Sequence, residues 1–366
     1  MEFGLDGSQR SLKEDARKFF ARNCPIAEVR RLTETEHAYD ADLWTKMADQ
    51  GYQGLIFPEE YGGLGLSIFE LVLILEECGR AALPGPFFST VALAGAVLNA
   101  TGSEEQKEKY LAPISTGEAR STLAILEANP SWNPADAQLC AVDGKLTGEK
   151  LFVTDAGVAD SIVVVARDGV YVVEAGSAGL SIVPMQGIDL ARKIYAVKFD
   201  HTPAEKLAKP EGLARGLEIA SVAAVGELVG CMQAMLDLTV EYAKERKQYG
   251  KAIGSFQAVQ HQCADSYIET ESSRSAAYYA AWALGEQTED ASVAASIAKV
   301  YASDAGRTVG NRSIQCHGGI GFTWESDLHL YYRRAKALET LLGDATFHRE
   351  RIACMVIDKT AAKGAQ

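Results

Sequence analysis

The chain has 366 residues, of which 47% are hydrophobic and 23% charged. This ordinary globular composition excludes disordered, collagen-like and disulfide-scaffold proteins, and the length suggests about two or three domains. With 36 basic and 49 acidic residues, the net charge of −13 disfavours general nucleic-acid binding, which needs a basic surface.

The seven cysteines are odd in number and contain no C-x-x-C pair. This pattern is typical of reduced, mostly buried thiols in a cytoplasmic protein. The first residues contain no apolar stretch of the kind found in signal peptides, and no uninterrupted apolar run reaches about 18 residues. We therefore expect a cytoplasmic protein without a membrane span.

Residues 1–118 are predicted to form a helical domain. Apolar residues recur at helical spacing in SLKEDARKFFARN, and IFELVLILEECGRAAL is apolar nearly all round, which indicates a central buried helix. The segment FPEEYGGLGLS between them carries three glycines and is predicted to be a turn region.

Residues 119–212 are predicted to form a β domain. Short runs rich in Val and Ile follow one another here: STLAIL, AQLCAV, KLTGEKLFVTD, DSIVVVAR, VYVVEA, LSIVPM and KIYAVKFD. Asp143-Gly144 and Asp168-Gly169 separate pairs of these runs and are typical of hairpin turns. Strands without intervening helices predict a small antiparallel β-barrel or sandwich.

Residues 213–366 return to helical periodicity. Helices are predicted in SVAAVGELVGCMQAMLDLTVEYAKERK, FQAVQHQCADSYIETESSRSAAYYAAWAL, ASVAASIAKVYASDAGRTVGNRSIQCHG and LLGDATFHRERIACMVIDKT. Their short connections predict an antiparallel four-helix bundle. The expected fold class is thus α+β and mostly α: a helical domain, a β domain and a C-terminal bundle.

Motifs of several common enzyme classes do not occur in the sequence. There is no G-x-G-x-x-G, G-x-x-x-x-G-K-[ST], G-x-S-x-G or H-E-x-x-H segment. The six histidines are scattered and none pairs with Cys or Asp at metal-ligand spacing, so no metal site is predicted.

Two polar segments stand out, ERKQYGKAIGSFQAVQ and QCHGGIGFTWE. The first surrounds a glycine turn between two helices; it is either a solvated loop or an anion site in which Arg246 meets a phosphate. The second contains Gly318, Gly319 and Gly321. These glycines indicate either a helix C-cap or a close approach of the backbone to a ligand.

Together and in this order, five segments resemble the acyl-CoA dehydrogenase family, whose members carry FAD: FPEEYGGLGL, TGSEEQKEKYLAPISTGE, LTGEKLFVTDAGVAD, ERKQYGKAIGSFQAVQ and QCHGGIGFTWE. The resemblance covers nearly the whole chain and implies the three-part fold described above, assembled as a tetramer. It also implies an acyl-CoA substrate, α,β-desaturation of its thioester, and an electron acceptor such as an electron-transfer flavoprotein.

The resemblance also implies a set of cofactor-binding residues. Phe152 takes the place of an aromatic residue that covers the isoalloxazine, and Thr154 that of a hydroxyl that hydrogen-bonds the flavin. In the family, one stretch reaches across a subunit interface to the pyrophosphate and adenosine of FAD. The residues of this chain that match it are Arg246, Gln248, Tyr249, Phe256 and Gln257. The loop that receives the adenylate side matches Gln315, Gly318 and Gly319.

The catalytic base has no counterpart at the family's usual positions. Removal of the α proton needs a carboxylate. The resemblance places the usual glutamate at Leu342, and the position used by some other members at Ala220. Asp344 is one candidate base if the chain shifts locally, and Glu218, two residues before Ala220, is a second if it turns inward. The alternatives are that Asp344 caps the last helix and that Glu218 is solvated.

The β domain departs from the family as well. The family's Thr-Glu-Pro-Gly-Ala-Gly-Ser stretch appears as LEANPSWN, so Leu126 replaces a threonine that helps bind flavin, and Trp132 falls near a serine that helps hold CoA. Residues 246–257, which serve the neighbouring subunit, match the family. Some bacterial members that degrade steroid side chains and dicarboxylates are α2β2 heterotetramers, and this chain resembles the subunit that lacks the base.

Three functions remain open on the sequence. The first is a subunit of a heteromeric acyl-CoA dehydrogenase whose partner, a homologous subunit, supplies the glutamate. The second is a self-sufficient homotetramer that uses Asp344, and the third is a non-catalytic flavoprotein scaffold. The sequence does not determine whether the acyl group is fatty, dicarboxylic, alicyclic or steroid-derived.

Overall fold

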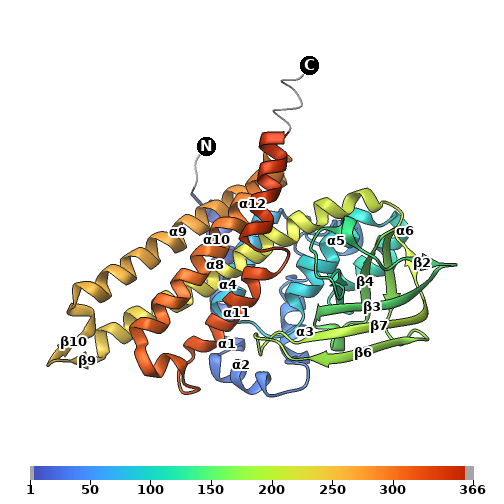
Figure 1. Cartoon of the computed structure of the whole chain (residues 1–366). Coiled ribbons are helices and arrows are strands. Elements are labelled where there is room, and N and C mark those ends of the chain that lie inside the picture. The colour runs from blue at the N-terminus through green and yellow to red at the C-terminus, as the bar shows by residue number, and fades with distance from the viewer. Residues whose placement is uncertain (1–3, 359–366) are drawn as a thin grey trace. The chain divides into compact units, whose positions relative to one another are not determined.

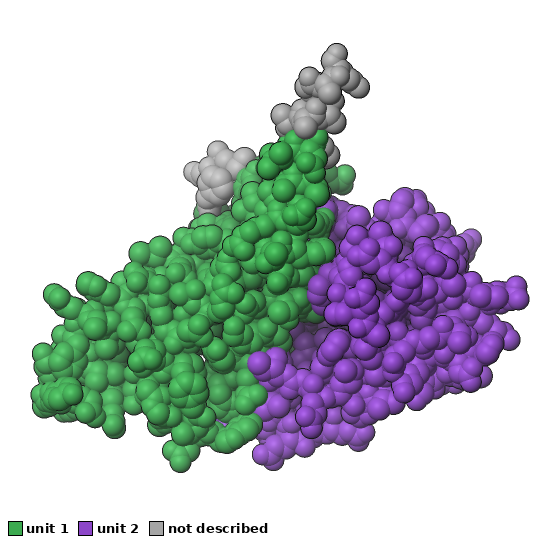
Figure 2. Space-filling view, viewed as in Figure 1, with its two compact units in different colours: residues 1–27, 68–83, 221–366 green, residues 28–67, 84–220 purple. Residues whose placement is uncertain are grey.

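The structure is a computed structural model that describes residues 4–358 and divides into two compact units (Figure 2). Unit 1 comprises residues 1–27, 68–83 and 221–366, and unit 2 comprises residues 28–67 and 84–220. Each unit gathers separate stretches of the chain. The division into consecutive domains at 1–118, 119–212 and 213–366 therefore stays a prediction.

Unit 2 contains short helices followed by two sheets (Figure 1). Its helical segments are α2 (Ile26–Thr33), α3 (Ala41–Asp49), η1 (Glu59–Tyr61), η2 (Phe88–Gly95), α5 (Ala96–Thr101), α6 (Glu104–Gln106), η3 (Lys107–Leu111), α7 (Ala112–Ser115), η4 (Pro134–Asp136), η5 (Ala156–Val158) and η6 (Pro210–Gly212). Its strands are β1 (Ser121–Ala124), β2 (Ala141–Val142), β3 (Lys145–Thr154), β4 (Ser161–Ala166), β5 (Gly169–Glu174), β6 (Leu180–Met185), β7 (Ile194–Pro203) and β8 (Glu205–Lys206).

Unit 1 is built from long helices (Figure 1). Its elements are α1 (Gly7–Asn23), α4 (Ile68–Arg80), most of α8 (Leu213–Glu245), β9 (Lys247–Gln248), β10 (Lys251–Ala252), η7 (Ile253–Ser255), α9 (Gln257–Gly285), α10 (Ala291–His317), η8 (Gly318–Phe322), α11 (Leu328–Thr340), α12 (Ala345–Ala353) and η9 (Cys354–Asp358). The predicted order of helices, strands and helices is confirmed, and α11 is a helix that the sequence analysis missed.

The two sheets of unit 2 pack face to face as a sandwich. Their strand orders are β1-β4-β5-β8 and β2-β3-β7-β6. Ile162 and Val164 of β4 share one core with Val153 of β3 and Val197 of β7. The prediction of an antiparallel domain is wrong for one pair, because β1 lies parallel to β4. All six residues of β4 are buried, which is typical of a strand covered on both faces.

Helix α8 is a buried helix that contains the longest apolar stretch. Among the described residues, only the helix Pro210–Glu245 is long and apolar enough to cross a membrane by length and composition. Its most apolar window is 89% buried inside the structure, as in the core helix of a bundle. The sequence analysis did not single out this helix as a candidate span.

Helices α4 and α8 pack at very short range in unit 1. A Cβ atom at Gly79 of α4 would lie 1.9 Å from the carbonyl oxygen of Glu227, and one at Gly230 of α8 would lie 1.9 Å from that of Glu76. Only glycine permits this approach. The buried Glu227 carboxylate accepts a 2.6 Å hydrogen bond from Arg334 of α11, whose guanidinium also donates to the Leu83 carbonyl oxygen.

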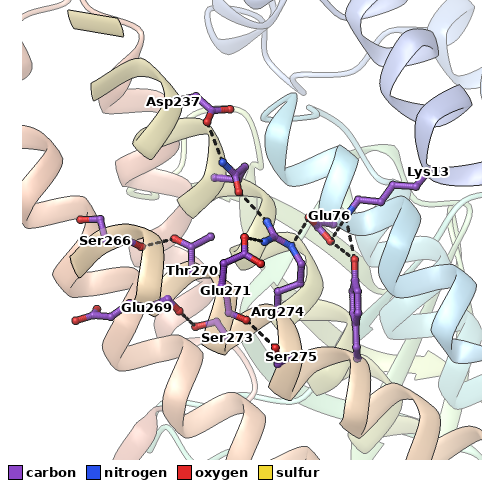
Figure 3. Close-up of polar contacts among 12 residues, drawn as sticks. Lys13, Glu76, Asp237, Ser266, Glu269, Thr270, Glu271, Ser273, Arg274 and Ser275 are labelled. Atoms are coloured by element: carbon purple, nitrogen blue, oxygen red, sulfur yellow. Dashed lines mark hydrogen bonds and ion pairs between the residues drawn. The ribbon is translucent and has the colours of Figure 1, made fainter. Parts of the chain in front are cut away.

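A second buried carboxylate, Glu76, joins α1, α4 and α9 (Figure 3). Its Oε2 accepts from Lys13 Nζ at 2.7 Å and from the Tyr278 hydroxyl at 2.8 Å, and its Oε1 accepts from Arg274 Nε at 2.9 Å. Arg274 continues the network to Gln233 of α8. Burial acts to raise the pKa of Glu76, but the neighbouring cations outweigh it and hold that pKa below its usual range.

We predict that Glu76→Gln destabilises the protein by about 3 kcal/mol, because it leaves two cations in the network without their shared carboxylate. Ionised Glu76 contributes to the free energy of unfolding at pH values above the pKa of a glutamate in the unfolded chain, about 4.3. This contribution is lost as the pH falls through the lower pKa that Glu76 has in the folded chain. The variant should therefore lose stability less steeply than wild type in this acid range. Urea unfolding at several pH values measures both effects.

The control for this prediction is Glu14→Gln, which removes an exposed carboxylate from the same helix as Lys13. Its effect should stay within about 0.5 kcal/mol. Equal stability of Glu76→Gln and Glu14→Gln would show that the Glu76 network does not hold α1, α4 and α9 together.

Candidate functional site

Phe152 lies at an irregularity of β3 in unit 2. The pairing of β3 with β7 shifts register between Lys150 and Val153, and Phe152 has a left-handed backbone with φ 55°. Left-handed conformation is strained for an aromatic residue, and a β-bulge redirects a side chain. Phe152 is 45% exposed although it belongs to a strand of the sandwich. Its ring is thus available to cover a ligand.

Thr154 ends β3, next to a buried polar cluster. Its carbonyl oxygen accepts a 2.6 Å hydrogen bond from Thr122, and the residue is 7% exposed. Asp155 follows with φ 54°, and its carboxylate accepts from the Ser89 hydroxyl at 2.7 Å. Sequence reasoning missed Ser89 and Asp155, because η2 and β3 meet only in the folded unit.

The segment that departs most from the family, residues 126–133, is fixed to β3 by a buried lysine. Lys150 Nζ donates to the Ile125 carbonyl oxygen at 2.8 Å and to Glu127 Oε1 at 2.7 Å. The backbone N–H of Leu151 donates to the carbonyl oxygen of Leu126, which is itself buried. Burial lowers the pKa of Lys150, and the Glu127 carboxylate opposes that shift. An apolar side chain therefore stands where the resemblance places a flavin-binding hydroxyl.

In unit 1, Arg246 and Gln248 lie on a small hairpin at the end of α8 (Figure 1). Strands β9 and β10 pair antiparallel, and Tyr249 and Gly250 form the turn with φ 53° and 79°. Positive φ at both positions is typical of a type I′ turn. Tyr249 is 93% exposed, and Arg246 and Gln248 are also exposed. The hairpin presents polar and aromatic groups that this chain does not cover.

Phe256 and Gln257 begin α9 directly after the hairpin. The Phe256 ring meets the Tyr249 ring edge-on at 6.2 Å, and Lys251 Nζ lies 4.4 Å from the Phe256 ring centroid. Gln257 is exposed at the first residue of the helix. The structure thus brings the predicted residues 246–257 together as one surface.

The glycine loop after α10 ends that helix. Gln315 is exposed, and its carbonyl oxygen accepts the N–H of Gly318. Gly318 has φ 64° and ψ −139°, a conformation almost confined to glycine. At Gly319, by contrast, a Cβ atom would meet no heavy atom within 4 Å. Among residues 4–358 no heavy atom lies where a side chain at 319 would go, so this position leaves room for a ligand to approach the backbone.

A buried aromatic contact links the hairpin to the glycine loop. His317 stacks on Tyr242 of α8 with ring centroids 4.5 Å apart, and its Nδ1 lies 2.8 Å from the Ser313 carbonyl oxygen. The Tyr242 carbonyl oxygen accepts the N–H of Arg246. Burial lowers the pKa of His317, which favours the neutral ring in this stack. Sequence reasoning missed both residues, because a lone His and a lone Tyr carry no spacing signal.

Leu342, the predicted position of the usual base, lies in a constrained loop between α11 and α12. It is 7% exposed and has φ 62°, which is unusual for a branched side chain. Its carbonyl oxygen lies 3.0 Å from His348 Nε2. Lys299 of α10 holds the end of α11, with Nζ 2.8 Å and 3.1 Å from the carbonyl oxygens of Leu338 and Glu339. Burial lowers the pKa of Lys299 to about 7. Burial and the neighbouring Lys299 cation lower the pKa of His348 to about 4.

Asp344 caps α12. Its Oδ1 accepts a 2.8 Å hydrogen bond from the Phe347 N–H, and the residue is exposed. A carboxylate at an N-cap satisfies an otherwise unpaired backbone donor. Ala220, the other base position, is fully buried in unit 2. Across residues 4–358, no three His, Cys, Asp or Glu side chains are grouped closely enough to hold a metal ion.

Comparison with known proteins identifies the family. Residues 6–118 match the N-terminal domain of acyl-CoA dehydrogenase, and residues 214–357 match its C-terminal domain. Acyl-CoA dehydrogenase IpdE2 of Mycolicibacterium smegmatis is 30% identical over 91% of this chain and 93% of its own length.

Solved structures share the fold over almost the whole chain. The Tcur3481–Tcur3483 steroid ACAD has a TM-score of 0.89 and 30% identity, and covers 97% of this chain and 99% of its own. The ChsE4–ChsE5 complex of Mycobacterium tuberculosis has a TM-score of 0.89 and 26% identity. The match covers 96% of this chain and 98% of the chain in that structure. The chain belongs to the acyl-CoA dehydrogenase family, whose members are oxidoreductases that act on the CH–CH bond of acyl-CoA.

Proposed function

We propose that this chain is one subunit of a cytoplasmic, heteromeric, FAD-dependent acyl-CoA dehydrogenase, and that a homologous partner subunit supplies the catalytic base. The reaction is α,β-desaturation of an acyl-CoA thioester, with an electron-transfer flavoprotein as the acceptor of the electrons. The observation that carries the proposal is the buried, apolar Leu342 at the position of the base.

The chemistry requires a carboxylate that this chain does not offer at the family's positions. An α proton beside a thioester is weakly acidic, and a positioned general base typically contributes about 10² to 10⁴ in rate. Leucine at 342 and alanine at 220 cannot accept a proton, and both are buried. Asp344 uses Oδ1 to cap α12 and is exposed to solvent, whereas a base has to meet the substrate in a dry pocket.

The residues of the hairpin and the glycine loop fit an FAD that binds against another subunit. No carboxylate within residues 4–358 forms an ion pair with Arg246, so its guanidinium is available for a diphosphate. Tyr249 is nearly fully exposed, and the space above Gly319 is open. A bound FAD would supply the acceptor for the hydride that leaves the β carbon. Arg246 would hold its diphosphate, and the exposed ring of Tyr249 would lie against it.

The relatives support a heteromeric assembly. The ChsE4–ChsE5 and Tcur3481–Tcur3483 structures each pair two differently named chains, and the latter is described as a steroid ACAD. One alternative function is a homotetrameric dehydrogenase that uses Asp344 as its base, and another is a non-catalytic flavoprotein scaffold. The three functions differ in the activity expected of this chain alone and of its complex with a partner.

We predict that Arg246→Ala weakens FAD binding to the assembled enzyme by about 1.5–3 kcal/mol, the value of a charge-assisted hydrogen bond. FAD dissociation is measured by flavin fluorescence. Lys244→Ala is the matched control, because Lys244 is an exposed cation that pairs with Glu241 on the same helix. Equal FAD affinity of wild type and Arg246→Ala would remove Arg246 from the site.

We expect this chain, purified alone, to oxidise acyl-CoA at least about 10²-fold more slowly than its complex with a homologous chain that retains the glutamate. Co-expression of the two chains, followed by light scattering and a dye-reduction assay, measures assembly and activity together. A fully active homo-oligomer contradicts the heteromeric proposal. A flavin-loaded complex without turnover supports the scaffold reading instead.

We predict that Asp344→Asn leaves the reconstituted complex nearly as active as wild type. Asparagine caps a helix about as well as aspartate but cannot act as a base, so this variant removes only the proton acceptor. Asp344→Ala is the control for the cap and should cost about 0.5–2 kcal/mol of stability. A loss of activity above about 10²-fold in Asp344→Asn, with flavin retained, would identify Asp344 as the base.

A further inference from the structure

The seven free cysteines fall into different environments, contrary to the expectation of mostly buried thiols. Cys24, Cys78 and Cys231 are buried, Cys354 is exposed, and the remaining three are half-buried. Two of those three, Cys263 of α9 and Cys316 of α10, lie at the same level of two packed helices, where the Cys316 thiol contacts the side chain of Gln262, the residue next to Cys263.

The packing of α9 against α10 places these two thiols opposite each other. Both lie far along their helices from the turn between Gly285 and Ala291, as facing residues of two antiparallel helices must. The register is shown independently by Arg312 of α10, which lies 3.0 Å from Glu269 and 3.7 Å from Asp265 of α9. One turn beyond Arg312, Cys316 Sγ lies 3.5 Å from the Gln262 side-chain oxygen.

The helices also approach closely along this seam. The buried face of α9 carries small residues at helical spacing: Ser266, Thr270, Ser273 and Ala277. Small side chains let neighbouring helices approach within the usual range of about 8–10 Å between axes. At that separation, facing cysteines can reach the S–S bond length of about 2.05 Å by side-chain rotation.

We propose that Cys263 and Cys316 are an oxidisable dithiol that closes to an intramolecular disulfide when it meets a small disulfide such as oxidised glutathione. The Cys263 thiolate attacks one glutathione sulfur, forms a mixed disulfide and releases one glutathione thiolate. The Cys316 thiol then loses its proton, and its sulfur attacks Cys263 and releases the second glutathione. Two protein thiols are oxidised, and one oxidised glutathione is reduced to two glutathione molecules.

The two thiols differ in a way that assigns the attacking sulfur. The neighbouring Cys316 thiol lowers the pKa of Cys263 to about 7, although burial acts in the opposite direction. The same contact and burial raise the pKa of Cys316. Because the thiolate is the nucleophile, Cys263 attacks first and Cys316 resolves the mixed disulfide. Cys316 directly precedes His317 and Gly318, so the bond ties the base of the glycine loop to α9.

The test treats the full, folded chain with oxidised glutathione, blocks the remaining thiols with iodoacetamide, and maps the products by peptide mass spectrometry. In wild type, we expect a Cys263–Cys316 linked peptide that a reducing agent removes. A short cysteine-containing peptide added to the same sample should acquire glutathione, which shows that the oxidant is active. Cys263 and Cys316 that remain separately alkylated while this peptide carries glutathione would overturn the proposal. This comparison needs no variant.

Two serine variants test the order of attack. Cys316→Ser should accumulate glutathione on Cys263, because the resolving thiol is missing. Cys263→Ser should give little glutathione on Cys316, whose thiol stays protonated. Cys140→Ser is the matched control, since Cys140 is half-buried in unit 2, and it should leave the linked peptide unchanged. Glutathione trapped on Cys316 rather than on Cys263 would overturn the assignment of the attacking sulfur.

Discussion

The close contact of α4 with α8 is the constraint on which unit 1 depends. Gly79 and Gly230 let two backbones meet where any side chain would collide with a carbonyl oxygen. At this contact the buried Glu227 binds Arg334, so α11 is fixed to α8. Helix α8 ends in the hairpin with Arg246, and α11 leads into the loop with Leu342. One tightly packed pair of helices thus positions both the hairpin that we propose to bind FAD and the loop that contains Leu342.

The loop around Leu342, the position that the resemblance assigns to the base, is held by buried contacts. Lys299 and His348 bind carbonyl oxygens on either side of the loop, and Leu342 keeps a strained left-handed backbone. Strain of this kind persists where the surroundings over-determine a conformation, commonly at functional sites. If the base position is at Leu342, as we propose, a leucine there cannot accept a proton, although the loop keeps its contacts. An ordered loop without a proton acceptor is consistent with the proposed heteromeric enzyme, in which the partner subunit supplies the base.

The groups proposed to bind FAD are unevenly exposed. Tyr249 and Arg246 face solvent, as expected of residues that act on another subunit, whereas Leu126 and Thr154 are buried within this chain's own β domain. Lys150 ties residues 125–127 to β3 in that domain, where the resemblance places a flavin-binding hydroxyl at the position of Leu126. The Cys263–Cys316 dithiol lies beneath the glycine loop and adds a proposed oxidation site to the same end of α9 and α10.

The order of helices, strands and helices was readable from the sequence, because it follows from local hydrophobic periodicity and turn residues such as Asp143-Gly144. The cofactor and base positions came from matching short motifs to a family. The parallel pairing of β1 with β4, the buried Glu76 network and the Tyr242–His317 stack could not be predicted, because each joins residues far apart in the chain. Asp344 shows the difference most clearly. The sequence allowed it to be either a cap or a base, and in the folded chain its carboxylate caps α12 through the Phe347 N–H, because the first N–H groups of a helix have no partner within it.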